Sequence, residues 1–212
     1  LSALCEKTGA NIEELSKAIG MDHRIGPKFL KASVGFGGSC FQKDILNLVY
    51  LCKYYGLEEV ADYWHQVIKI NDYQKDRFAQ KIIDHFGGDI TGKKIAILGW
   101  AFKANTNDSR ESPAIYIAEK LFRAGAILEI YDPMVSKESI FSDIDFYWES
   151  SKTKDLNSRI SVIESVSKLD LSIDAVSILT EWEEFKSLNF SKTIVFDGRG
   201  ILSSSMYSIG KG

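Results

Sequence analysis

Residues 94–99 read Lys-Ile-Ala-Ile-Leu-Gly, a short apolar run that ends in glycine. A run of this length and composition is typical of a strand that is buried on both faces of a parallel sheet. A helix is predicted to follow, because Ser112 can cap it, Pro113 suits its first position and Gly125 ends it. Further strands are predicted at residues 126–131, 174–179 and 193–196. This alternation of strands and helices predicts a doubly wound α/β layer.

The residues before this strand follow a helical pattern instead. Helices are predicted at residues 1–8, 12–19, 41–55 and 57–86, each followed by a glycine. In the last of these, Trp64, Val67 and Ile82 are assigned to the core. The predicted fold class is therefore α/β, with an all-helical domain over residues 1–92 and a Rossmann-like doubly wound domain over residues 93–212. Residues 137–159 form the polar stretch that we expect to be a variable surface excursion.

The composition excludes several classes of protein. With 212 residues, 45% of them apolar and 26% charged, the chain is neither disordered nor fibrous. The net charge of -3, without a basic block, argues against nucleic acid as a partner. Apolar stretches such as residues 95–100 are too short to cross a membrane, and we expect no association with a membrane. The three histidines lack ligand spacing, so no metal is expected.

The three cysteines, Cys5, Cys40 and Cys52, form no C-x-x-C pair and leave an odd number. Free thiols indicate a reducing compartment, and we expect a cytoplasmic protein. The sequence also starts at Leu1 inside a helical pattern, with neither an initiator methionine nor a cap. We therefore expect a fragment of a longer protein.

Residues 35–44 read Gly-Phe-Gly-Gly-Ser-Cys-Phe-Gln-Lys-Asp and carry the strongest chemical signal. The glycines allow a backbone to approach a ligand closely, and the loop delivers Cys40 to the first turn of a helix. Free amides at that end favour the thiolate form, so Cys40 is a candidate nucleophile. Lys43 adds positive charge, and Asp44 could orient a water molecule or hold the lysine. The alternative is that Cys40 is a small buried apolar residue, as expected for Cys5 and Cys52.

This segment resembles the active-site loop of the UDP-glucose 6-dehydrogenases, within the UDP-glucose/GDP-mannose dehydrogenase family. The likeness covers nearly the whole chain and includes residues 32–51, 61–76, 99–103, 108–112, 131–133, 180–182 and 196–199. It implies an NAD-dependent enzyme that oxidises UDP-glucose twice, to UDP-glucuronate. It also implies that Cys40 forms a thiohemiacetal and then a thioester, while Asp44 positions the hydrolytic water.

The resemblance assigns further roles position by position. Substrate contacts are implied for Phe29, Lys31, Ala32, Ser33, Val34, Gly35, Phe36 and Gly37 in the loop, and for Phe102, Lys103 and Arg199 at strand ends. Arg24 matches an arginine that reaches the sugar nucleotide of a neighbouring subunit, which implies a homo-oligomer. Lys43 and Arg110 resemble contacts to NAD. The alternative for Arg24, Lys31 and Lys103 is an ordinary solvated surface charge.

The sequence departs from this family in two places. The turn at residues 99–103 contains no G-x-G-x-x-G fingerprint, so the predicted α/β domain is not an ordinary NAD domain. In the family a separate N-terminal domain holds NAD, and we expect this chain alone to bind NAD poorly and to turn over little. Residues 200–212 are also fewer than expected, which puts the last edge of the fold in doubt.

Two alternative functions stay open. A dehydrogenase of another nucleotide sugar, such as GDP-mannose or a UDP-N-acetylhexosamine, would share the cysteine, although Phe-Gln-Lys-Asp after Cys40 favours UDP-glucose. The chain could also be a non-catalytic module that binds nucleotide sugars.

Overall fold

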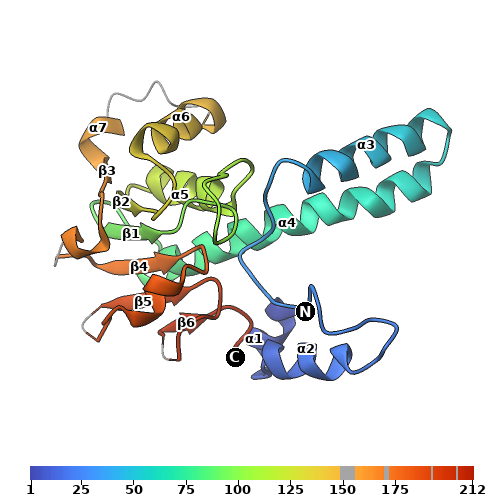
Figure 1. The fold of residues 1–212 in the computed structure, drawn as a ribbon, viewed down its shortest axis with the longest axis horizontal. Helices are drawn as coiled ribbons and strands as arrows, with labels where there is room; N and C mark the ends of the chain where they lie inside the picture. Colours follow the sequence, from blue (N-terminus) through green and yellow to red (C-terminus); the bar gives the residue numbers. More distant parts are fainter. Residues whose placement is uncertain (149–155, 170–171, 192, 204) are drawn as a thin grey trace.

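The computed structural model describes residues 1–148, 156–169, 172–191, 193–203 and 205–212. Figure 1 shows a sheet flanked by helices, a helical hairpin that projects from it, and two short helices close to the C-terminus. No helix of the described residues is both long enough and apolar enough to span a membrane.

The chain opens with α1 (Ser2–Thr8) and α2 (Ile12–Gly20). Gly9 ends α1 with a φ of 75°, a conformation that glycine adopts at little cost. Asn11 caps α2, because its side chain accepts a hydrogen bond from the Glu13 amide at 2.8 Å. Residues 21–40 then contain no helix or strand, as the sequence predicts.

The projecting hairpin consists of α3 (Phe41–Tyr54) and α4 (Glu58–His85), joined through Gly56 at a φ of 70°. A small cluster of buried residues holds the two helices together: Ile45, Val49, Cys52, Ala61 and Ile68. These helices confirm the predicted ones. The assignment of Trp64 to the core is wrong, because this side chain lies on the exposed face of the hairpin. Val67 is partly buried against the small cluster, and Ile82 is fully buried.

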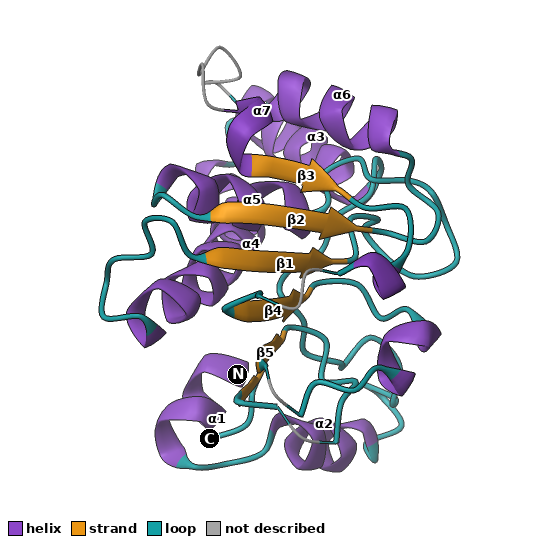
Figure 2. Cartoon of the chain, turned by 90° about the vertical axis from the view of Figure 1, so that its left-hand side faces the viewer, coloured by secondary structure: helices purple, strands orange, loops and turns teal. Residues whose placement is uncertain are grey.

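Within the described residues, six parallel strands form one sheet, in the order β3-β2-β1-β4-β5-β6. Figure 2 labels the part of this row that runs from β3 to β5. Their bounds are β1 (Lys94–Leu98), β2 (Ile127–Tyr131), β3 (Ile160–Val162), β4 (Ala175–Ile178), β5 (Ile194–Asp197) and β6 (Tyr207–Ser208). This order is that of doubly wound nucleotide-binding folds, and it confirms the predicted α/β class. Helix α5 (Pro113–Arg123) leads from β1 to β2 and begins at Ser112, whose side chain accepts from the Ala114 amide.

Part of the expected surface excursion is instead packed structure. Helix α6 (Lys137–Tyr147) buries Ile140 and Ile144, and Trp148 after it is also buried. The apolar side chains explain the difference, because their helical spacing gives one face to the core. Residues 149–155 of the same stretch lie outside the described residues. Helix α7 (Leu156–Arg159) then leads into β3, and the short 3₁₀ helices η1 (Val166–Lys168) and η2 (Glu183–Ser187) follow β3 and β4.

The main core includes both faces of the central strands, because successive residues of β1 and β4 are buried. The second half of α4 contributes Phe78, Ala79, Ile82 and Ile83 to it, together with the apolar residues of β1 and α5. Helix α4 therefore belongs to both hydrophobic clusters, and the domain boundary at residue 92 stays a prediction.

A buried carboxylate ties α1 to the opposite end of the chain. Glu6 accepts hydrogen bonds from Arg77, from the Tyr207 hydroxyl at 2.7 Å and from the Gly210 amide at 2.8 Å. Lys81 also lies 3.2 Å from this carboxylate. The first helix is thereby fixed beside β6, although β6 has only two residues.

Candidate active site

Cys40 lies at the start of α3, where its thiol is exposed. The first turn of α3 closes on it, because the Asp44 amide donates to the Cys40 carbonyl at 2.8 Å. Cys5 and Cys52 are buried in apolar surroundings, as expected. The alternative of a buried apolar role therefore fails for Cys40 and holds for the other two cysteines.

The loop before Cys40 packs tightly on the segment that follows β1. The Gly38 amide donates to the Arg110 carbonyl at 2.8 Å. A Cβ atom at Gly37 would come within 2.4 Å of the Glu111 carbonyl oxygen, and one at Gly38 would lie 3.2 Å from the Phe102 ring. Only glycine allows this approach, which brings the thiol beside residues 102–111.

Arg110 supplies a positive charge close to the thiol. Its guanidinium is exposed and bonds to both carboxylate oxygens of Asp108, at 2.9 and 2.8 Å. The pKa of Arg110 is raised above its usual value, chiefly by the hydrogen bond from Arg110 to Asp108, with smaller contributions from the charges of Cys40 and Tyr147. The backbone of Arg110 is joined to the loop two residues before Cys40, through the bond from the Gly38 amide.

Lys43 and Asp44 are exposed in the first turn of α3. Both side chains are open to a ligand or to water in front of this turn.

A cleft of about 490 Å³ lies at the other end of the loop. Lys31, Ala32 and Ser33 line one side, and Glu181 and Arg199 line the other. The structure thus brings together the loop and the last strand end that the sequence singles out separately. Parallel α/β sheets bind ligands at this edge, beyond the carboxyl ends of their strands.

Arg199 joins three strand ends. Its Nε donates to the Leu179 carbonyl at 2.6 Å and its Nη2 to the Phe102 carbonyl at 2.9 Å. Burial lowers the pKa of Arg199, and the charge of Glu181, whose Oε2 lies 3.3 Å from Nε, opposes that shift. Among the described residues, Nη1 has no hydrogen-bond partner. The guanidinium of Arg199 can therefore donate from Nη1 to an anionic ligand.

The remaining loop residues differ in what they can offer. The Val34 side chain is fully buried against Gly198, so only its backbone can reach a ligand. The Phe36 ring contacts the Phe41 ring edge-on, at 4.7 Å between centroids. Phe102 is partly buried, and the ammonium of the exposed Lys103 lies 5.3 Å from its ring centroid.

Two predicted site residues lie apart from the cleft. Arg24 is exposed and pairs with Asp22, its Nη2 lying 2.6 Å from the carboxylate. Phe29 is fully exposed at a φ of 61°, which is uncommon for a residue other than glycine. Neither side chain lines the cleft that Lys31 and Arg199 share.

The end of β1 does not fit a dinucleotide. The Trp100 and Ala101 amides donate to Oδ2 of the buried Asp132, at 2.7 and 3.0 Å, and the Trp182 indole donates to the same oxygen. In dinucleotide-binding domains, amides at this turn bind the pyrophosphate. Here a carboxylate of the chain occupies them, in agreement with the missing glycine fingerprint.

Three functional candidates escape the sequence patterns. Asn71 holds the loop at Phe36, and Gln42 in α3 donates to Glu111 at 3.0 Å. Glu111 itself has a φ of 55°. Of these three, only Asn71 has a signal in the sequence: it is a polar residue at helical spacing within an apolar stripe. A buried amide at such a position requires hydrogen-bond partners.

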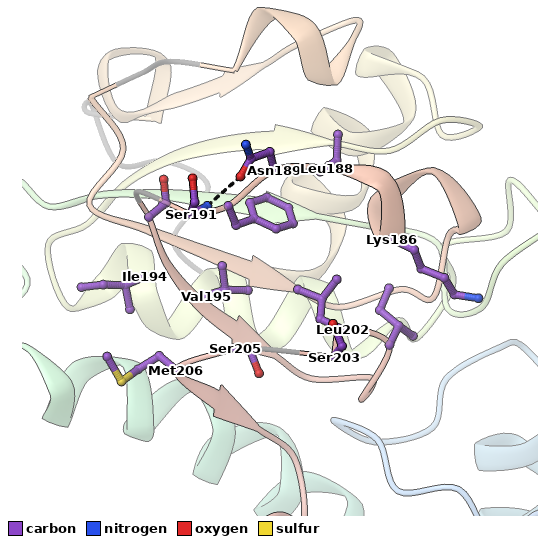
Figure 3. A pocket seen from close by; sticks show the side chains of 13 residues that line it. Lys186, Leu188, Asn189, Ser191, Ile194, Val195, Leu202, Ser203, Ser205 and Met206 are labelled. Atoms are coloured by element: carbon purple, nitrogen blue, oxygen red, sulfur yellow. Dashed lines mark hydrogen bonds between the residues drawn. The ribbon is translucent and has the colours of Figure 1, made fainter.

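A larger hollow of about 990 Å³ lies beside β5 (Figure 3). Val195 and Leu202 line it, together with Lys186, which also borders the cleft. Only residues 198–206 connect the parallel strands β5 and β6. Such connections usually need about a dozen residues or more and carry a helix, so this crossover is unusually short. None of the predicted site residues lines this hollow.

Two family models match the sequence. Residues 1–73 match the central domain of the UDP-glucose/GDP-mannose dehydrogenase family, and residues 96–204 match its UDP binding domain. UDP-glucose 6-dehydrogenase 1 of Arabidopsis thaliana is 46% identical over 236 residues, covering 100% of this chain and 49% of that protein. UDP-glucose 6-dehydrogenase 1 of Glycine max is 47% identical over 235 residues, with the same coverage. The chain spans about half the length of the curated relatives it matches.

Solved structures share the fold. A UDP-glucose dehydrogenase from the archaeon Pyrobaculum islandicum superposes with a TM-score of 0.80 at 28% identity, covering 99% of this chain and 46% of that one. A UDP-D-ManNAc dehydrogenase from Pyrococcus horikoshii gives a TM-score of 0.72 at 24% identity, covering 100% and 47%. At that lower identity the likeness concerns the fold alone.

Proposed function

The chain belongs to the UDP-glucose/GDP-mannose dehydrogenase family, and from this premise we propose that the complete protein is an NAD-dependent UDP-glucose 6-dehydrogenase. It oxidises UDP-glucose to UDP-glucuronate. The observation that carries this proposal is the exposed Cys40 thiol at the start of α3. The loop that ends there also lines a cleft with Arg199.

Cys40 divides the four-electron oxidation into two stages. After the primary alcohol has become an aldehyde, the thiolate adds to the aldehyde carbon, a C–S bond forms, and the carbonyl oxygen takes a proton. Loss of a hydride from that carbon, together with the proton of its hydroxyl group, gives a thioester. Water then adds to the thioester and the C–S bond breaks, which releases the carboxylate and the thiol. Asp44, exposed one turn into α3, orients this water.

The cleft holds the UDP part of the substrate. Its diphosphate carries about two negative charges, which match the partly free guanidinium of Arg199 and the exposed ammonium groups of Lys31 and Lys103. The backbone of residues 32–37 lies along the sugar nucleotide, with Phe102 packed behind Gly38. Phe29 belongs to the same loop along the sugar nucleotide, and Arg24 reaches the nucleotide of a neighbouring subunit.

Lys43 and Arg110 are the residues of this chain that contact NAD. Both are exposed cations beside Cys40, suited to the anionic pyrophosphate. When bound, NAD accepts one hydride in each of the two oxidations. Because Asp132 occupies the amides at the end of β1, most of the NAD site lies outside this α/β unit.

We place the protein in the cytoplasm as a homo-oligomer. The three cysteines are unpaired, which suits a reducing compartment. The α3–α4 hairpin exposes a group of large apolar side chains, which include Leu46, Tyr50, Leu51, Tyr54, Tyr55, Leu57, Val60, Tyr63 and Ile70. An exposed apolar surface of this kind is typical of an interface, and its occupant is the hairpin of a second copy.

Sedimentation tests the oligomer. Tyr54→Glu, at a side chain that is 71% exposed on α3, is expected to yield a smaller species. Phe146→Glu, at an aromatic side chain on α6 that is 81% exposed, provides the matched control and is expected to sediment as wild type. A single small species for the unmodified protein would contradict the proposal.

Mass spectrometry tests the reaction. The complete protein is incubated with UDP-glucose and NAD and then denatured, with Cys40→Ser as control. A substrate adduct on Cys40, absent from the control, is expected. Adducts on Cys5 or Cys52, or undiminished oxidation by Cys40→Ser, would contradict the assignment.

A substrate panel with GDP-mannose and a UDP-N-acetylhexosamine tests the choice of sugar. Faster turnover of either compound would identify it as the substrate in place of UDP-glucose.

Calorimetry on the chain of residues 1–212 is expected to detect binding of UDP-glucose and little binding of NAD. UDP-glucose binding without turnover by the complete protein would indicate a non-catalytic module.

A further inference from the structure

The backbone of Phe36 is held by a side chain rather than by a neighbouring strand. Asn71 Oδ1 accepts from the Phe36 amide at 2.8 Å, and Asn71 Nδ2 donates to the Phe36 carbonyl at 3.0 Å. Both bonds come from one residue of α4 that is only 4% exposed. A single side-chain amide thus satisfies both main-chain polar groups of Phe36.

The loop is also fitted to α4 at the residues that precede Phe36. A Cβ atom at Gly35, where φ is 129°, would come within 2.7 Å of Asn71 Oδ1 and 3.3 Å of Lys75 Cγ. One turn further along α4, Gln74 Nε2 donates to the Ser33 carbonyl at 2.6 Å. The helix surface therefore fixes the backbone from Ser33 to Phe36.

The same clamp leads directly towards the thiol. Beyond Phe36, the Gly38 amide is tied to the Arg110 carbonyl, and α3 then begins after Cys40. The Phe36 ring also contacts the Phe41 ring. A shift of the Phe36 backbone would therefore move both the wall of the cleft and the start of α3.

We propose that Asn71 is a positioning residue, whose amide holds residues 33–38 in the conformation that binds the sugar nucleotide and presents Cys40. Asn71 touches neither the cleft lining nor the thiol, and it acts through the backbone of Phe36. The part that concerns the nucleotide rests on the proposed function. The part that concerns the loop does not.

Asn71→Leu removes both hydrogen bonds at nearly constant volume. The matched control is Gln66→Leu, which removes a side-chain amide from the same helix where it bonds only within α4. Two quantities are measured well below the melting temperature of each protein: amide hydrogen exchange over residues 33–38, and the Kd for UDP-glucose. For Asn71→Leu we expect exchange at Phe36 and the Kd each to rise at least tenfold, with exchange in β1 unchanged. For Gln66→Leu we expect neither change.

Exchange at Phe36 that stays as slow as in wild type would overturn the clamp, as would an equal acceleration in β1. Accelerated exchange with an unchanged Kd would overturn the positioning role while leaving the proposed function intact. If wild type itself fails to bind UDP-glucose, the proposed function fails, and the exchange data still decide whether Asn71 holds the loop. Should Asn71→Leu not fold, Asn71→Asp keeps the acceptor and loses the donor. It is expected to raise the Kd as well, and a wild-type Kd for it would overturn the proposal.

Discussion

The side-chain amide of Gln42 donates to the carboxylate of Glu111 at 3.0 Å, joining the first turn of α3 to the segment before α5. The same carboxylate oxygen accepts from the Tyr116 hydroxyl at 2.6 Å. The helix that begins after Cys40 is thereby braced against the α/β unit. Glu111 holds this position at a φ of 55°, so the strained backbone and the brace occur at one residue.

Loss of this brace is expected to destabilise the protein. Glu111→Ala leaves the partly buried Tyr116 hydroxyl and the Gln42 amide without their acceptor, which costs about 1–3 kcal/mol in the free energy of unfolding. Urea denaturation followed by circular dichroism measures the change. Glu138→Ala, in the first turn of α6, is the control and is expected to stay within about 0.5 kcal/mol of wild type. Equal stabilities of Glu111→Ala and wild type would show that the brace contributes nothing.

Thiol labelling of the native chain is expected to distinguish the cysteines. Cys40 is exposed, whereas Cys5 is 2% and Cys52 is 7% exposed. Brief treatment with iodoacetamide, read by peptide mass spectrometry, is expected to modify Cys40 alone, because the other thiols react only after local opening. Cys40→Ser is expected to abolish the fast label. Labelling of Cys5 or Cys52 at the rate of Cys40 would be incompatible with the described packing.

Asp132 is expected to be indispensable for the carboxyl end of the sheet. Its two oxygens accept hydrogen bonds from the amides of Trp100, Ala101, Met134 and Val135 and from the Trp182 indole. Asp132→Ala leaves several buried donors unpaired and is expected to cost about 3 kcal/mol or more. Thermal unfolding measures this, with the exposed Asp145→Ala as control. A melting temperature close to that of wild type would mean that water replaces the carboxylate without loss.

Acid is expected to weaken the contact between α1 and the C-terminal edge. Burial alone would raise the pKa of Glu6, but hydrogen bonds from Tyr207, Gly210 and Arg77, with the charge of Arg77, outweigh it and leave this pKa lowered. Glu6 therefore has a lower pKa in the folded protein than in the unfolded chain, where it is about 4.5. Such a carboxylate stabilises the fold at pH values above 4.5, and this stabilisation is lost as the pH falls through the pKa of the folded state.

The free energy of unfolding of wild type is therefore expected to fall on acidification below about pH 4.5, and that of Glu6→Gln to fall less steeply. Glu14→Gln, on the exposed surface of α2, is the control and is expected to follow wild type. Parallel pH profiles for wild type and Glu6→Gln would refute the assigned role of Glu6.

The sequence predicts those features that depend on neighbouring residues. The apolar run of β1 and the Ser112-Pro113 start of α5 carry local signals, and both appear where expected. The spacing around Cys40 leaves open whether its thiol is buried or exposed, and the structure shows that it is exposed. Strands β3 and β6 were not predicted, because three and two residues are too few for a periodic pattern.

Features set by contacts between distant segments could not be predicted in the same way. The bonds from Asn71 to Phe36 span 35 residues, and the bond from Gln42 to Glu111 spans 69. For Trp64 the sequence predicts burial where the structure shows exposure. A regular apolar spacing cannot distinguish a side chain that faces the core from one that faces outward on the hairpin. Even so, the comparison with known proteins confirms the family that the motif around Cys40 indicates.

Helix α4 runs unbroken over 28 residues, about 42 Å at 1.5 Å per residue. One end is anchored beneath the sheet, the other carries the hairpin, and Asn71 lies near the middle. Because the second half of α4 is packed against the sheet, a tilt of the hairpin displaces Asn71 and the loop that it binds. A displacement of the hairpin therefore reaches the thiol by two routes: through Asn71 and the loop, and through α3, which begins next to Cys40.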